Sequence, residues 1–371
     1  MRPRLAALMA AATFGAAIGS LAIGPALADP SAAPPARPAP AYNAPTNEYN
    51  QPDLQGVWTN ATLTEFERPA EYGDRLTMTP QEVAKAEGDN AKAMADGNAP
   101  TDPKLKVTDL PYDCGRGFKG VDCGYNSGWV DPGSTVMRVA GEPRTSLITK
   151  PANGRAPPLL PAARQRLQAL YAQFRGAYQH ADNPETRALG ERCLLSFGNS
   201  AGPVMLPLLY NNNYQIVQTK GEVAILVEMV HDVRIVRLGG THLPASLRPW
   251  LGDSIGHYEG QTLVVETTNF PPQQNFHGSS ENLKVTERFT RVAPGRILYQ
   301  FTVEDPTVWA EPWGGEYEFG ATKGPIYEYA CHEGNYALRD ILAGARAQEQ
   351  QTAAAPPPPP PMPGSGGGGT Q

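Results

Sequence analysis

Short runs of alternating apolar and polar residues dominate the chain from Tyr214 onward and predict β-strands. The runs are YQIVQT, EVAILVEMV, DVRIVRL, IGHYEG, QTLVVETTNF, NLKVTERFTRV, RILYQFTVED, GEYEFG and IYEYAC, and only short turns separate them. Many strands with no helix between them are typical of an antiparallel meander. Because a sheet of this size usually curls to remove its edges, we expect a mainly β fold that closes into a barrel or a sandwich.

The part of the chain before this meander contains fewer strands and more loops. We expect one strand at GVWTN (residues 56–60), whose Gly-x-Trp pattern is similar to that of the first lipocalin strand and favours a lipocalin-like barrel. A helix is predicted over about 79–95, because Thr79 and Glu82 form a capping-box pattern at its start. Apolar residues at helical spacing predict a second helix over about 161–177. The N-terminal region is therefore expected to be loop-rich and partly helical.

Both ends of the chain differ from this β-rich middle. Residues 1–28 combine two arginines, an apolar run and the sequence Ala-Leu-Ala, which together predict a secretory signal peptide cleaved after Ala28 rather than a membrane anchor. Residues 29–52 predict a disordered lead-in rich in proline and alanine, and residues 347–371 predict a disordered tail rich in proline and glycine. A single β-rich domain over 53–346 remains, and we expect no membrane span after cleavage.

The charge of the chain limits the class of partner. The 371 residues carry a formal net charge of −6, and no basic cluster with interleaved aromatic residues occurs, so nucleic acid is not an expected partner. The sequence also lacks the glycine-rich motifs of nucleotide binding and the G-x-S-x-G elbow of serine hydrolases. We therefore expect a small-molecule ligand or substrate, no cofactor and no metal.

If the protein is exported, its cysteines fold in an oxidising compartment, where disulfides form. In the periplasm or outside the cell, four cysteines are more typical of two disulfides than of reactive thiols. We expect Cys114 to pair with Cys123 because they are close in sequence, and Cys193 to pair with Cys331 by elimination, although four cysteines allow three pairings. A zinc site is disfavoured because no C-x-x-C spacing occurs.

The stretch IGHYEGQTLVVETTNF (residues 255–270) predicts a β-hairpin with one carboxylate in an otherwise apolar strand. If the loop at Gly260 has two residues, cross-strand partners have an odd sum of residue numbers, and Asp253, His257 and Glu266 share one face. Such a group could carry acid/base chemistry. The alternative is that Glu266 points into water from the wet face of the sheet, and a bulge or a longer loop would break the parity.

Glu228 is the stronger anomaly. Both alternating sets of residues in EVAILVEMV are largely apolar, so this strand is predicted to be covered on both sides. A buried carboxylate must be paired, hydrogen-bonded or protonated. Its expected companions are His231, Asp232 and Arg234 at the following bend. The group is therefore either a functional site or a buried Glu–Arg ion pair.

Two further carboxylates lie in the next strand pair. By strand alternation, Glu287 is on the same face as the apolar residues of NLKVTERFTRV. A two-residue loop at Pro294-Gly295 would place Glu304 diagonally across from Glu287 on that face. Two carboxylates on a shielded face could act as a general acid and a general base. His332, in YEYACHEGNY, is a further candidate, but this string lacks the second histidine of a metalloprotease motif.

Amide and aromatic side chains supply candidates for substrate binding. Asn211 and Asn213 belong to the run YNNNYQ, although asparagine runs also make turns through side-chain to backbone hydrogen bonds. Trp309, Trp313 and Tyr327 could form an aromatic wall for a substrate.

Several of these strings also carry a resemblance. The strings are YNNNYQIVQT, VEMVHDVRIV, WLGDSIGHYEGQTLVVETTNF, SSENLKVTERF, FTVEDPTVW and YEYACHEGNY, and they lie within residues 140–346. They are similar to strings in a widespread uncharacterised family of secreted bacterial β-rich proteins. The resemblance implies export and a β-rich fold but no activity, so the polar residues have to be judged by their chemistry.

The patterns together favour a secreted or periplasmic β-barrel enzyme, a hydrolase or lyase that uses acid/base chemistry on a small organic molecule or a sugar derivative. The catalytic candidates are Glu228, His231, Asp253, His257, Glu266, Glu287, Glu304 and His332. A second hypothesis is a non-catalytic barrel in which the same groups orient a ligand. A third is an envelope-associated structural protein whose proline-rich tail contacts a partner.

Overall fold

The computed structural model describes residues 42–98, 104, 131–173, 181–196 and 202–354. Within these residues the chain is mainly β, with three α-helices, which confirms the predicted fold class. The predicted signal peptide, the pairing of Cys114 with Cys123 and the last part of the predicted tail lie outside the described residues.

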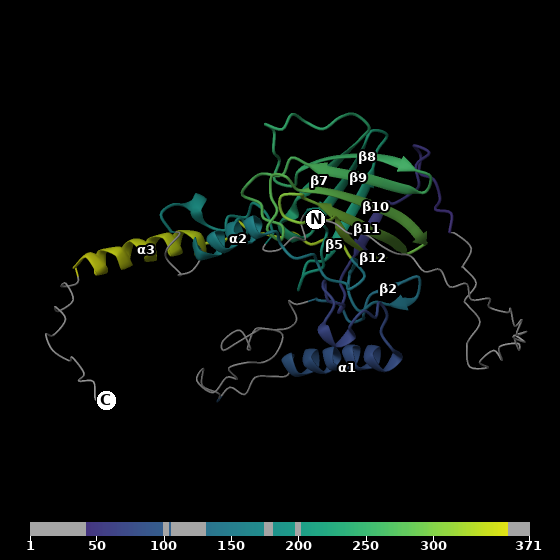
Figure 1. Cartoon of the computed structure of the whole chain (residues 1–371), viewed down its shortest axis with the longest axis horizontal. Helices are drawn as coiled ribbons and strands as arrows, with labels where there is room; N and C mark the ends of the chain where they lie inside the picture. Colours follow the sequence, from purple (N-terminus) through teal and green to yellow (C-terminus); the bar gives the residue numbers. More distant parts are fainter. Residues whose placement is uncertain (1–41, 99–103, 105–130, 174–180, 197–201, 355–371) are drawn as a thin grey trace, which may run out of the picture. The chain divides into compact units, whose positions relative to one another are not determined.

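Nine of the described strands close into a barrel, so the barrel is confirmed over the sandwich. Each strand pairs with the next in this order, and the last pairs with the first: β1 (Gly56–Thr59), β5 (Asn213–Gln218), β6 (Glu222–Val227), β7 (Val233–Leu238), β8 (Asp253–Glu259), β9 (Thr262–Thr268), β10 (Lys284–Ala293), β11 (Arg296–Glu304) and β12 (Trp313–Ala321). Figure 1 shows β7 to β11 side by side.

Three short strands lie outside this closed ring. The strand β4 (Ile148–Lys150) pairs with the beginning of β12, whereas β1 pairs with its end. The strands β2 (Arg138–Val139) and β3 (Glu142–Pro143) form a separate two-stranded sheet. These strands belong to the N-terminal half, which is loop-rich as the sequence predicts.

Among the described strands, β7 and β8 are the one parallel pair, which departs from the predicted meander. A tight turn can join antiparallel neighbours, but a parallel pair needs a longer connection that returns the chain to the same end of the sheet. Residues 239–252 make this connection without regular secondary structure. The connection carries His242.

The barrel interior is filled by side chains. Its largest fully buried aromatic residues include Trp58, Tyr214, Tyr299, Tyr317, Phe289 and Phe319. Met205 lies among them, because its N–H donates to the Tyr299 hydroxyl at 3.1 Å and its carbonyl accepts a hydrogen bond from the Tyr317 hydroxyl. A packed interior of this kind leaves the ends of the barrel as the place where a ligand could bind.

The hairpin of β8 and β9 has the predicted parity. Gly260 and Gln261 form a two-residue loop, and Gly260 has a positive φ of 57°, as such a loop requires. Asp253 is opposite Thr268, so the sum of partner numbers is odd along the hairpin. Along the two strands, interior-facing residues such as the buried Val265 alternate with outward-facing residues. The outward-facing set includes Asp253, His257 and Glu266.

The predicted shared face of Glu287 and Glu304 is wrong. The loop is Pro294-Gly295 as expected, but Val292 is an extra, unpaired residue next to it in β10. This bulge changes the parity of partner numbers for the rest of the strand pair. Glu287 consequently faces the interior and is fully buried, whereas Glu304 lies on the outer face and is half-buried.

The helices agree with the sequence pattern in the N-terminal half only. Helix α1 (Pro80–Gly97) begins with the predicted capping box, since Thr79 and Glu82 exchange side-chain to backbone hydrogen bonds of 2.7 and 3.3 Å. Helix α2 (Pro161–Gln173) begins at the predicted residue. Helix α3 (Ala337–Ala354) was not predicted, and the expected domain end at residue 346 falls inside it. Short 3-10 turns occur at Ala70–Tyr72, Pro184–Thr186 and Met229–His231.

Part of the predicted lead-in is also ordered against the barrel. The Ala44 N–H donates to the Gln261 side chain at 3.1 Å, and the Gln51 side-chain amide donates to the Thr219 carbonyl at 2.9 Å. Both contacts join residues far apart in sequence, and both Ala44 and Gln51 are buried. The described fold therefore begins before residue 53.

Candidate functional site

The candidate residues of the sequence lie in separate parts of the barrel. Glu287 is in the interior, Glu228 is at one end, and Asp253 and Glu266 are on the outer face. The structure therefore offers three carboxylate environments, each with its own chemistry.

In the interior, Glu287 forms a buried ion pair with Arg234. The shortest N–O distance is 2.5 Å, and both side chains are almost completely shielded from solvent. The Tyr299 hydroxyl donates a further hydrogen bond to Glu287 at 2.8 Å. Burial, together with the Glu287 charge, raises the pKa of Tyr299 well above its ordinary value, so this hydroxyl remains a donor. Arg234 thus belongs to Glu287 and not, as the sequence suggested, to Glu228.

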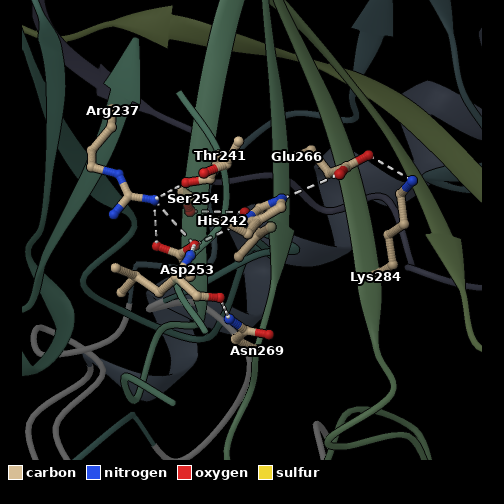
Figure 2. Close-up of polar contacts among 10 residues, drawn as sticks. Arg237, Thr241, His242, Asp253, Ser254, Glu266, Asn269 and Lys284 are labelled. Carbon is tan, nitrogen blue, oxygen red and sulfur yellow. Dashed lines mark hydrogen bonds and ion pairs between the residues drawn. The ribbon is translucent and has the colours of Figure 1, made fainter. Parts of the chain in front are cut away.

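On the outer face, His242 lies between Asp253 and Glu266 (Figure 2). Its Nδ1 is 2.8 Å from Asp253 Oδ2, and its Nε2 is 3.2 Å from Glu266 Oε1. Arg237 pairs with Asp253 at 3.0 Å, and Lys284 pairs with Glu266 at 2.6 Å. We call these five residues the His242 clamp.

Both carboxylates of the clamp are held in their ionised form. Burial alone would raise the pKa of Asp253, but the Leu243 N–H, His242 and Arg237 lower it overall. The hydrogen bond from Lys284 lowers the pKa of Glu266 despite its partial burial, and His242 lowers it further. Ionised carboxylates only accept hydrogen bonds, so the geometry is satisfied when both ring nitrogens of His242 donate.

The His242 clamp fastens the connection 239–252 to the barrel wall. Neither ring nitrogen of His242 is left to serve a substrate, because each faces a carboxylate. The neighbouring Ser254 hydroxyl is buried and bonds to Thr267 at 2.8 Å, so it is not placed as a nucleophile. Among the described residues, no three His, Cys, Asp or Glu side chains gather in a way that could hold a metal ion.

His257 does not join Asp253 and Glu266, although it shares their face. Its Nε2 is 3.2 Å from Glu259, and its side chain is exposed. The histidine that reaches the two carboxylates is His242, which the sequence analysis missed. His242 belongs to an irregular connection, where no strand periodicity relates it to residues of the hairpin; its position eleven residues before Asp253 was the only available signal.

A cavity of about 860 Å³ opens at the end of the barrel where β5 begins and β6 ends. Its walls come from the loop before β5, the turn after β6, residues 190–191, the segment 327–331 and the first turns of α3. We call it the rim cavity. It brings together four candidate residues, which are Asn211, Asn213, Glu228 and Tyr327.

Glu228 occupies the turn after β6 and is only 3% exposed. The strand ends at Val227, and the backbone then reverses through Val230 and His231, which have positive φ values of 62° and 49°. A positive φ is unfavourable for a β-branched residue such as Val230, so the turn is held by its surroundings. This reversal places the Glu228 side chain against Asn213 and the wall of the cavity.

Neutral donors hold the Glu228 carboxylate. Its Oε2 accepts hydrogen bonds from the Asn213 side chain at 2.7 Å and from the Asn213 N–H at 3.3 Å. Its Oε1 accepts a longer bond of 3.4 Å from the Tyr327 N–H. Within the described part of the chain, no ion pair involves Glu228, since Arg234 pairs with Glu287 and His231 contacts the Tyr329 carbonyl oxygen.

A disulfide joins two walls of the rim cavity. Cys193 and Cys331 are bonded, as predicted, with Cα atoms 5.8 Å apart. The bond connects the segment after residues 190–191 to the segment 327–331. His231 adds a polar link, because its Nδ1 is 2.8 Å from the Tyr329 carbonyl oxygen. The cavity is therefore built from distant parts of the chain that a covalent bond keeps together.

The remaining candidates are not among the described residues that line the cavity. Trp309 and Trp313 are buried and pack edge to face with ring centroids 5.4 Å apart, so they belong to the core and do not form a wall for a ligand. His332 is exposed in the loop before α3. Glu304 is opposite Lys284 on the outer face of the barrel.

Comparison of the chain with models of known protein families found no match, and comparison with curated proteins found none either. The resemblance to a family of secreted bacterial β-rich proteins therefore stays a prediction. Among the described helices, none has the length and apolar character needed to cross a membrane. Function has to be inferred from the geometry of the rim cavity.

Proposed function

We propose that the protein is an exported small-molecule-binding barrel whose ligand occupies the rim cavity. The cavity carries this proposal because it combines a suitable volume of about 860 Å³ with convergent polar groups and apolar walls. Asn213 and Glu228 lie at its polar side, and Leu338 and Ile341 of α3 lie at its apolar side. The filled interior of the barrel supports a site at the rim.

The same geometry favours binding over the hydrolase or lyase hypothesis. Acid/base catalysis needs a donor and an acceptor within reach of one substrate. Glu228, Glu266 and Glu287 instead lie in three separate environments, and the described walls of the rim cavity contain no histidine. The buried Glu228 carboxylate, held by the Asn213 amide in the cavity wall, is suited to orient a ligand.

Two observations support the proposal of export. The first 28 residues have the pattern of a cleavable signal peptide. The Cys193–Cys331 disulfide is typical of proteins that fold in the periplasm or outside the cell. Subcellular fractionation with an antibody against the protein tests this part of the proposal.

A thermal-shift screen of the purified protein against sugars, aromatic compounds, amines and fatty acids tests ligand binding, because a ligand of the native state raises Tm. Ala337→Trp places a large side chain in the cavity wall, and Ala343→Trp places the same side chain on an exposed position of the same helix outside the wall. We expect compounds that stabilise the wild type to lose their effect in Ala337→Trp and to keep it in Ala343→Trp.

Two outcomes would contradict the proposal. Compounds that stabilise both tryptophan variants equally would place the binding site elsewhere. Compounds that are bound and then converted, with conversion lost in Glu228→Gln, would restore the enzyme hypothesis. Product analysis by mass spectrometry of every stabilising compound distinguishes this second outcome from simple binding.

A further inference from the structure

All charged residues in the described walls of the rim cavity are acidic. Its described walls contain the carboxylates of Asp131, Glu191, Glu228 and Glu328 and no lysine, arginine or histidine. Glu191 has its own partner, since Arg187 pairs with it at 2.8 Å from outside the walls. Asp131 and Glu328 are exposed, where water screens their charge. Glu228 is the buried carboxylate of the cavity.

The hydrogen bonds of Glu228 show that its carboxyl group acts as an acceptor on both oxygens. All three bonds come from N–H donors, which is the pattern of an ionised carboxylate. A buried charge is costly unless an opposite charge compensates it, and Asn213 and Tyr327 supply only neutral donors. Among the described residues, the Oε1 atom accepts one long hydrogen bond of 3.4 Å, so it keeps the capacity to accept a stronger bond.

The other walls of the cavity suit an apolar body with a positive charge. Tyr210, Tyr327 and Tyr329 line it, and the faces of tyrosine rings attract cations. Leu338 and Ile341 add aliphatic surface from α3. Tyr327 is 71% exposed, so this ring is available to a ligand rather than committed to the core.

We infer that the rim cavity selects an organic ammonium ion, a protonated amine carried on an aromatic or aliphatic body; this inference rests on the proposed binding function. The ammonium group donates to Glu228 Oε1 and supplies the cation that the described cavity walls lack. Tyrosine rings surround the charge, and Leu338 and Ile341 contact the body. Anionic compounds are disfavoured by the buried Glu228 carboxylate, and neutral compounds leave Glu228 without a cation.

Isothermal titration calorimetry of the full protein at pH 7 with three matched probes tests this inference. The probes are phenethylamine, 2-phenylethanol and 3-phenylpropanoate, which share a phenylalkyl body and are respectively cationic, neutral and anionic. We expect phenethylamine to bind at least about tenfold more tightly than the alcohol, because a charge-assisted hydrogen bond contributes more than a neutral one. The anion is expected to bind most weakly.

Variants locate the selectivity. Glu228→Gln is expected to weaken phenethylamine binding at least about tenfold and to change binding of the alcohol less than about twofold. Glu333→Gln removes the same charge from an exposed position outside the cavity walls and is expected to leave both affinities unchanged. Tyr327→Leu, at an exposed position that folding tolerates, is expected to weaken the amine about threefold more than the alcohol.

Circular dichroism establishes that each variant is folded, and Tyr327→Leu keeps the test valid should Glu228→Gln fail to fold. Equal binding of amine and alcohol, with both abolished in Ala337→Trp, overturns the cation preference and leaves the binding function intact. Phenethylamine that does not bind, while a neutral or anionic compound does, also overturns the inference. Failure of every screened compound overturns the proposed function itself.

Discussion

Two buried carboxylates of this barrel are held in opposite ways. Glu287, in the interior, has an arginine at 2.5 Å and a tyrosine hydroxyl at 2.8 Å. Glu228, at the rim, is nearly as buried, but its donors among the described residues are the neutral N–H groups of Asn213 and Tyr327. A charge that the chain neutralises itself belongs to the fold, whereas a charge that it leaves uncompensated beside a cavity can be completed from outside.

The topology explains why one carboxylate has an arginine and the other does not. Arg234 on β7 and Glu287 on β10 both occupy buried positions of strands that face the same interior, so they meet across it. Glu228 lies one residue beyond the end of β6, where the backbone has left the alternation of the sheet. The side chain therefore lies in the wall of the rim cavity, while Arg234 pairs with Glu287.

The largest expected effect concerns the interior pair. Glu287→Gln leaves the buried Arg234 without a counter-charge, and breaking such a pair typically lowers the free energy of unfolding by about 3–5 kcal/mol. Chemical denaturation followed by tryptophan fluorescence measures this change. The double variant Glu287→Gln with Arg234→Met is the control and should recover part of the loss. If Glu287→Gln alone is as stable as the wild type, the interior carboxylate does not stabilise the fold more than the rim carboxylate, and the comparison fails.

The next effect concerns the covalent link of the rim. Replacing Cys193 and Cys331 together by alanine is expected to lower the free energy of unfolding by about 2–4 kcal/mol, because the cross-link closes a long loop. The cavity walls that it joins should also separate, so binding of rim-cavity ligands is expected to weaken. Urea denaturation and calorimetry measure the two effects. If the double alanine variant is less stable but binds ligands as the wild type does, the disulfide stabilises the fold without shaping the cavity.

Glu228→Gln sharpens the comparison with Glu287→Gln. We expect the free energy of unfolding to change by about 1 kcal/mol or less, because the amide oxygen still accepts from Asn213 and no buried cation is left unpaired. The same denaturation assay measures it. A loss as large as that of Glu287→Gln would mean that Glu228 is part of the structural core.

The smallest effect comes from Asp232, a second carboxylate near the rim. Its Oδ2 is buried with no hydrogen-bond partner among the described residues, and burial raises the pKa of Asp232 from 3.8 to about 6, an effect that His231 partly offsets. Between about pH 4 and about pH 6, the Asp232 carboxyl therefore keeps its proton in the folded state but has lost it in the unfolded state. The contribution of Asp232 to the free energy of unfolding consequently falls as pH rises through this range.

Asp232→Asn should remove this pH dependence. The variant is expected to match the wild type near pH 4 and to exceed it above pH 6 by on the order of 0.5 kcal/mol, a value discounted for partial exposure. Denaturation curves between pH 4 and pH 7 measure the difference. A constant difference across this range would show that titration of Asp232 is not its cause.

The sequence predicts the barrel well where its rules are local. Alternation identifies the nine barrel strands, and the two-residue loop at Gly260 gives the correct register of β8 and β9. The strand predicted at IYEYAC (326–331) is wrong, because these residues have no regular secondary structure. In β10, one extra residue, Val292, reverses the faces and separates Glu287 from Glu304. Nothing in the local pattern marks that bulge, because Val292 has the same strand propensity as a paired residue.

The candidate site was predictable only in part, because contacts across the fold decide it. Glu228 is buried as predicted, but not for the predicted reason, because one face of β6 is half-exposed and the strand ends at Val227, so the turn buries this side chain. Its partners Asn213 and Tyr327 are 15 and 99 residues away, and no spacing rule connects them. Helix α3, which supplies the apolar wall, was missed because it follows loop-like sequence and leads into a proline-rich tail.

The filled interior has a consequence for how such a barrel can change over time. The residues that keep the chain folded, such as Arg234, Glu287 and Tyr299, lie inside, and the cavity walls come mostly from loops and the first turns of α3. Substitutions in loops are tolerated more readily than substitutions in a packed core. Substitutions in the cavity walls can therefore change which ligand is bound while the interior keeps the chain folded. Barrels with the same interior can then bind different molecules.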